Sequence, residues 1–66
     1  MEPSKLFIEL LRKIHDEYIQ YQIETDLWVN FDTWAWDNQG EIGSTLWQFI
    51  HRKYGDWDSA VDILKI

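Results

Sequence analysis

The first third of the chain has apolar residues at steps of three and four, with polar residues between them. This spacing places the apolar side chains along one face of an α-helix. The residues of this stripe are Phe7, Leu10, Leu11, Ile14, Tyr18 and Tyr21. We therefore predict an amphipathic helix near residues 4–23.

The last third of the chain repeats this spacing in two shorter stretches. The first stretch predicts a helix near 44–54, and Gly55 follows it as a natural stop. Either Asp58 or Ser59 is suited to open a final short helix, because both residue types cap helix N-termini well. That helix is predicted near 58–65.

Residues 27–42 fit two patterns. In a helix, Leu27 and Phe31 would lie one turn apart on the same face. In a strand, Leu27, Val29 and Phe31 would alternate, and β-branched and aromatic residues favour strands. The polar run at 37–40 suits either a hairpin turn or a helix end. We therefore expect a mostly α fold, a small helical bundle in which 27–42 forms either a further helix or a short β-hairpin.

A chain of 66 residues forms a single domain, 1–66, with a thin margin of stability. It has no cysteine for a disulfide, but it carries five Trp, three Tyr and three Phe. Each ring buries about 150–250 Å² in a core, so aromatic packing is the expected compensation. The predicted core consists of Phe7, Leu10, Leu11, Ile14, Leu46, Trp47, Ile50 and Trp57.

Residues 54–60 read Tyr-Gly-Asp-Trp-Asp-Ser-Ala. This order resembles the aromatic-Gly-x-Trp-x-x-Ala turn of small tri-helical modules associated with homing endonucleases. The resemblance lies within residues 44–66, and it implies a helical fold in which Trp57 pins two helices together. It transfers no site residues, because such modules contact DNA and this chain is acidic.

The charge of the chain is −6, and its distribution is uneven. No Lys or Arg occurs between Ile14 and His51. The acids within that stretch are Asp16, Glu17, Glu24, Asp26, Asp32, Asp37 and Glu41. Such a field repels phosphates and anionic lipids and attracts basic surfaces, although a charge of this size also serves solubility. We expect no direct binding to nucleic acid or to membranes.

The residue types needed for catalysis or cofactor binding do not form a pattern. The two histidines, His15 and His51, stand apart and read as surface residues. A calcium-loop alignment around Gly40 would place Ala35 and Leu46 at the first and last ligand positions, where carboxylates are required. We expect no enzymatic activity, no cofactor and no metal.

Targeting signals were sought at the N-terminus and along the chain. There is no basic and apolar leader, and no apolar run approaches the ~20 residues that span a bilayer. A cytoplasmic location is the default expectation.

Acids and aromatic rings together predict a binding role. Aromatic residues are enriched at interface hot spots, and complementary charge speeds encounter. We predict a protein-binding module whose acidic middle docks on a basic partner surface, such as that of a nucleic-acid-binding enzyme. Small acidic inhibitors encoded by phages and mobile elements share this character. The predicted contact residues are Asp26, Asp32, Asp37 and Glu41 for charge, and Trp34 and Trp36 as anchors.

Three alternatives stay open. Trp34 and Trp36 are each also suited to the core. In a sugar-binding module, the two rings would stack on pyranose faces while Asn30 and Asp32 bind hydroxyl groups. In a self-association domain, spare aromatic residues would complete the core of a homodimer.

Overall fold

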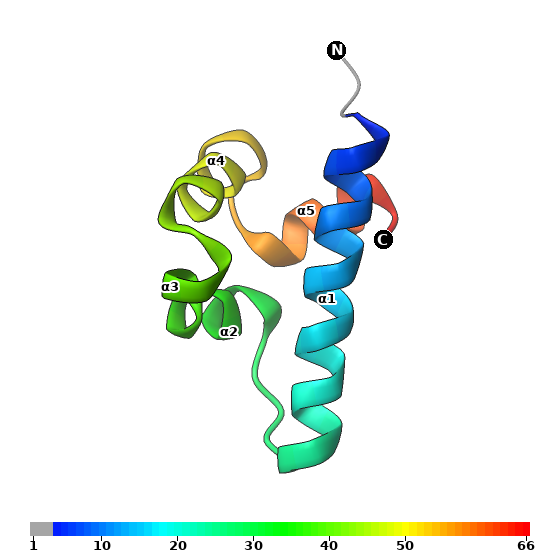
Figure 1. Cartoon of the computed structure of the whole chain (residues 1–66), viewed down its shortest axis with the longest axis vertical. Helices are drawn as coiled ribbons and strands as arrows, with labels where there is room; N and C mark the ends of the chain where they lie inside the picture. The colour runs from blue at the N-terminus through cyan, green and yellow to red at the C-terminus, as the bar shows by residue number, and fades with distance from the viewer. Residues whose placement is uncertain (1–3) are drawn as a thin grey trace.

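The structure is a computed structural model that describes residues 4–66 (Figure 1). Its helices are α1 (Lys5–Thr25), α2 (Phe31–Asp37), α3 (Gln39–Ile42), α4 (Ser44–Tyr54) and α5 (Trp57–Leu64). No strand occurs among the described residues, so the mostly α prediction is confirmed and the hairpin alternative for 27–42 is wrong. That segment instead forms two short helices.

Helix α1 sets the shape of the molecule. Its 21 residues run down most of the view in Figure 1, with α2, α3 and α4 to one side of it and α5 passing behind it. A helix of this length spans about 30 Å, which accounts for most of the longest dimension of 37 Å. It begins where the Phe7 N–H donates to the Ser4 side chain, and it ends at Asp26 in the left-handed conformation.

Helix α2 begins later than the apolar spacing suggests. The Asn30 side chain accepts a hydrogen bond from the Thr33 N–H at 2.9 Å, so Asn30 is the N-cap and Phe31 the first helical residue. An asparagine in this position satisfies a backbone donor that has no partner inside the helix. Residues 27–30 are therefore a connecting loop instead of the first turn of a helix.

The connecting loop is anchored to α1 by a single carbonyl group. The Val29 oxygen accepts hydrogen bonds from the Tyr18 hydroxyl and from the Gln22 side-chain amide, the latter at 2.9 Å. Burial, with a further contribution from the Asp58 charge, raises the pKa of the Tyr18 hydroxyl. The hydroxyl therefore stays protonated, and a donor, at neutral pH.

Helix α5 begins at Trp57, before either predicted opening. Asp56 is its N-cap, and the Ser59 N–H donates to the Asp56 carboxylate at 2.7 Å. Gly55, predicted as the stop of the preceding helix, has φ +92° and lies just after the end of α4. That conformation favours glycine, so one residue ends α4 and leaves the next free to cap α5.

The Asp56 cap gives stability a defined pH dependence. Hydrogen bonds from Ser59 lower the pKa of Asp56, so its stabilising charge is complete above the usual aspartate pKa of about 4 and is lost as pH falls through the lowered value. Asp56→Asn keeps an acceptor without the charge. At pH 6 we expect the free energy of unfolding of wild type to be about 0.3–1 kcal/mol larger than that of the variant, the usual effect of a charge at a helix N-terminus. Urea titrations of both proteins from pH 6 to pH 2 should show this difference vanish in acid; a constant difference would contradict it.

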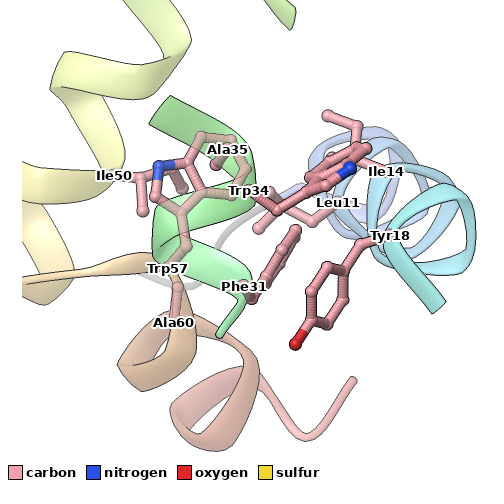
Figure 2. Packing of buried hydrophobic residues seen from close by; sticks show 9 residues of the cluster. All are labelled: Leu11, Ile14, Tyr18, Phe31, Trp34, Ala35, Ile50, Trp57 and Ala60. Atoms are coloured by element: carbon pink, nitrogen blue, oxygen red, sulfur yellow. The ribbon is translucent and has the colours of Figure 1, made fainter. Parts of the chain in front are cut away.

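The core is built from rings and small residues at the junction of α1, α2, α4 and α5 (Figure 2). The Trp57 ring is fully buried and meets the Phe31 ring edge-on, with centroids 5.3 Å apart. Phe31 in turn stacks on Tyr18 at 4.9 Å. Trp57 thereby joins α5 to α2, as the resemblance implied.

Most of the predicted core is confirmed, with one correction. Leu11, Ile14, Ile50 and Trp57 are buried. The residues that are only partly buried against this core are Phe7, Leu46 and Trp47. Leu10 is 45% exposed, so its assignment to the core is wrong. The reason is that Leu10 lies at the edge of the buried stripe, where it lines an open groove.

Candidate partner-binding surfaces

The two tryptophans predicted as anchors lie on opposite sides of α2. Trp34 is 7% exposed and packs toward α1, with its ring 5.8 Å from that of Tyr18. Trp36 is 53% exposed and packs edge-on against Trp47 of α4 at 5.0 Å. Residues two positions apart on a helix point in nearly opposite directions. The expectation that both rings form one outward face is therefore wrong, and Trp34 belongs to the core.

Asp32 is occupied by bonds within the chain. Its Oδ1 atom accepts the Trp57 N–H at 3.1 Å and lies 2.7 Å from His51 Nε2. Asp58 on α5 makes the reciprocal contact with α2. Its two carboxylate oxygens accept hydrogen bonds from the N–H groups of Phe31 and Asp32 at 3.1 and 3.2 Å. Each of α2 and α5 therefore has its N-terminus capped by an acid from the other helix, an arrangement we call the crossed caps.

The crossed caps explain several polar residues without a ligand. The His51 ring also stacks on Trp47 at 3.9 Å, so one face of the ring packs on Trp47 while its Nε2 atom contacts Asp32. Within residues 4–66, no group of three or more His, Asp or Glu side chains is arranged to hold a metal ion. The acid-histidine pair at Asp32 and His51 is thus accounted for by helix capping and packing.

A second surface lies at the C-terminal end of α1, the lower end in Figure 1. The exposed side chains of Ile23, Leu27 and Trp28 follow one another here, and we call them the tip patch. Trp28 is 71% exposed, and its indole N–H donates to the Asp26 carboxylate at 3.4 Å. The exposed acid Glu24 flanks the same turn. Of the predicted contact residues, Asp26 is the one that belongs to this surface.

The tip patch was not predicted, because Leu27 was expected in either a helix or a strand and not in a loop. Once Asn30 is recognised as a cap, residues 27 and 28 fall in a short loop, where two large apolar side chains have little to pack against. Ile23 offers a second signal, since it lies outside the apolar stripe of α1. The cap therefore identifies residues 27 and 28 as loop positions, and the apolar stripe identifies Ile23 as exposed.

A third surface is a groove between α1 and the α2–α3 segment, with a volume of about 280 Å³. Its lining combines apolar and charged side chains from both walls. The lining residues are Leu10, Lys13, Ile14, Glu17, Trp34, Asn38, Glu41 and Ile42. The predicted residues Trp34 and Glu41 therefore meet here, while Asp37 lies exposed at the end of α2. We call this feature the α1–α3 groove.

Comparisons of the chain with protein-family models, with curated proteins and with solved structures find no match. Among residues 4–66, no helix is both long enough and apolar enough to cross a membrane. The functional proposal accordingly rests on the surfaces described above.

Proposed function

We propose that this protein is a small acidic module that binds a basic surface of another protein, with the tip patch as its main docking site. The observation that carries the proposal is the exposure of Trp28, whose indole N–H donates to the Asp26 carboxylate, at a helix end that also exposes the acid Glu24. No Lys or Arg lies between residues 14 and 51 to neutralise them.

Each part of this surface has a role in binding. Ile23, Leu27 and Trp28 are exposed large apolar side chains at one end of the molecule, and tryptophan is enriched among the residues that dominate binding energy. The carboxylates around the ring steer a cationic partner and select against acidic ones. Trp36 and the adjacent Asp37 offer a second pair of exposed ring and acid on α2, which retains Trp36 as a predicted anchor.

The charge of the tip patch favours a different protein over a second copy of this chain. In a symmetric dimer the same patch meets itself. Glu24 and Asp26 would then face the same two acids of the other copy, and like charges in contact repel. The same acids would attract a basic partner, so the tip patch favours binding to a basic protein over self-association.

The sugar-binding alternative loses its residues. Asn30 caps α2, Asp32 bonds to His51 and to the backbone of α5, and Trp34 is buried. Trp36 is the one member of that set with an exposed ring, and a single ring, with Asn30 and Asp32 occupied by capping, makes a poor sugar site.

The proposal predicts that Leu27→Ser/Trp28→Ala weakens partner binding at least tenfold, as expected for a hot-spot tryptophan. The protein would be immobilised and exposed to an extract of its host, and the retained partner quantified. The matched control, Leu6→Ser/Ile63→Ser, removes two other exposed apolar side chains and should leave retention unchanged. Equal loss in both variants, or in neither, would contradict the tip patch as docking site.

Salt and nucleic acid test the charge of the partner. Raising salt from about 0.1 to 1 M shortens the screening length from about 10 to 3 Å and should release a basic partner. If the partner uses that surface to bind nucleic acid, added duplex DNA or RNA should compete with the module. If the amount of retained partner does not change with salt, binding depends on apolar packing instead of charge pairing.

A further inference from the structure

The α1–α3 groove has an apolar floor and polar acceptors on both sides. Leu10 and Ile42 supply apolar surface from opposite walls. The acceptors are Glu17 on α1, Glu41 on α3 and Asn38 between α2 and α3. Within residues 4–66, no hydrogen bond or ion pair uses the carboxylate of either glutamate. Both glutamates are therefore available to a ligand that enters from solvent.

The size of the groove suits one side chain. Its volume of about 280 Å³ falls just below the range of about 300–1,000 Å³ that small-molecule pockets occupy. Leu10 is 45% exposed and would become buried under an occupant, which is a gain for an apolar stem. A floor of this kind with acids at its rim matches a long side chain that has an aliphatic stem and a cationic head.

We infer that the α1–α3 groove binds an arginine side chain of the basic partner, a conclusion that rests on the proposed function. The stem would lie along Leu10 and Ile42, and the guanidinium would reach the acceptors of Glu17 and Glu41. Arginine fits better than lysine because its planar head carries five donors in a fork and is more weakly hydrated. With one carboxylate on each wall, the guanidinium can donate to both at once, whereas the ammonium group of lysine is a compact point charge.

The remaining charge on the rim does not reverse this preference. Lys13 lies one turn before Glu17 on α1 and also lines the groove. Among residues 4–66 it forms no ion pair with Glu17, and the rim holds one cation against two acids. The two glutamates would repel phosphates and acidic peptides, and they would also repel the acidic tip patch of a second copy.

The test uses Nα-acetyl-arginine amide as the probe and the full wild-type chain. We expect saturable NMR shifts of the Trp34 indole N–H and of the Leu10 and Ile42 methyl groups. Nα-acetyl-norleucine amide, which has an apolar stem without the charge, should bind more weakly. The absence of a saturable shift up to tens of millimolar, shifts confined to the tip patch, or equal binding of norleucine would overturn the inference.

A pair of matched variants tests the role of charge at the groove. Glu17→Gln/Glu41→Gln should weaken binding of the arginine probe about fivefold, the expected effect of two exposed ion pairs. Glu24→Gln/Asp26→Asn makes the same change in charge at the tip patch and should alter this affinity less than twofold. Equal weakening by both pairs would indicate long-range attraction alone and would overturn the site.

The two proposals fail in distinguishable ways. If the tip-patch variant loses the partner while the arginine probe does not enter the groove, the proposed function stands and the arginine site is wrong. If the probe enters the groove but the tip-patch variant keeps the partner, the arginine site stands and the docking site of the proposed function is wrong.

Discussion

Replacing Trp57 with alanine is expected to unfold this protein at 25 °C. The ring is fully buried, joins α5 to Phe31 of α2, and belongs to the core cluster in Figure 2. Truncating a buried Trp costs about 3–5 kcal/mol, through lost burial and the cavity that remains. At roughly 0.05–0.15 kcal/mol per residue, the whole stability of a chain of this length is about 3–10 kcal/mol. One substitution therefore removes a large share of this stability, and all of it at the lower end of the range.

Circular dichroism and urea denaturation would measure this loss. The matched control is Trp28→Ala, which deletes the same side chain where it is 71% exposed and should change stability by less than about 0.5 kcal/mol. Trp57→Phe should be milder than Trp57→Ala, because it keeps a ring. It also removes an indole N–H that is buried and has no hydrogen-bond partner among residues 4–66. A cooperative transition of wild-type stability in Trp57→Ala would contradict the assigned role.

Replacing Asp58 with alanine is expected to cost about 2 kcal/mol, the upper range for loss of a helix cap. The substitution leaves the N–H groups of Phe31 and Asp32 without their acceptor at the start of α2. Asp62→Ala is the control, because Asp62 is an exposed acid on the same helix. Urea midpoints of the two variants give the comparison, and equal values would show that the crossed caps contribute nothing.

A double-mutant cycle tests whether the two caps act together. Asp32→Ala removes the reciprocal cap on the Trp57 N–H. Because each cap positions the helix that carries the other, losing one should weaken the second. The double variant should therefore lose less than the sum of the single losses, by about 0.5 kcal/mol or more.

The sequence predicted the elements that depend on local pattern. The long apolar stripe of α1 and the glycine after α4 each act within a few residues, and both were located well. The start of α2 was not, because the Asn30 cap was overlooked and the loop before it is held by contacts of the Val29 carbonyl with Tyr18 and Gln22, 11 and 7 residues earlier. Helical spacing from Leu27 to Phe31 contains no information about that anchor.

The candidate site was harder to predict than the fold. Whether a ring is buried depends on which helix faces it, and the partners of Trp34 lie on α1 while those of Trp36 lie on α4. The acids pose the same problem. Asp32 and Asp58 are 26 residues apart and become structural only because the starts of α2 and α5 meet. The sequence distinguishes charged from apolar positions. It does not show which acids cap a helix and which remain free for other contacts.

The anchor of the connecting loop has a consequence for how this module changes over time. Its acceptor is the backbone oxygen of residue 29, which any amino acid would supply. The neighbouring side chains of Leu27 and Trp28 point into solvent and contribute little to the core. Under the proposed function, mutations at these two positions would alter partner choice without weakening the scaffold, so that recognition and folding could evolve separately.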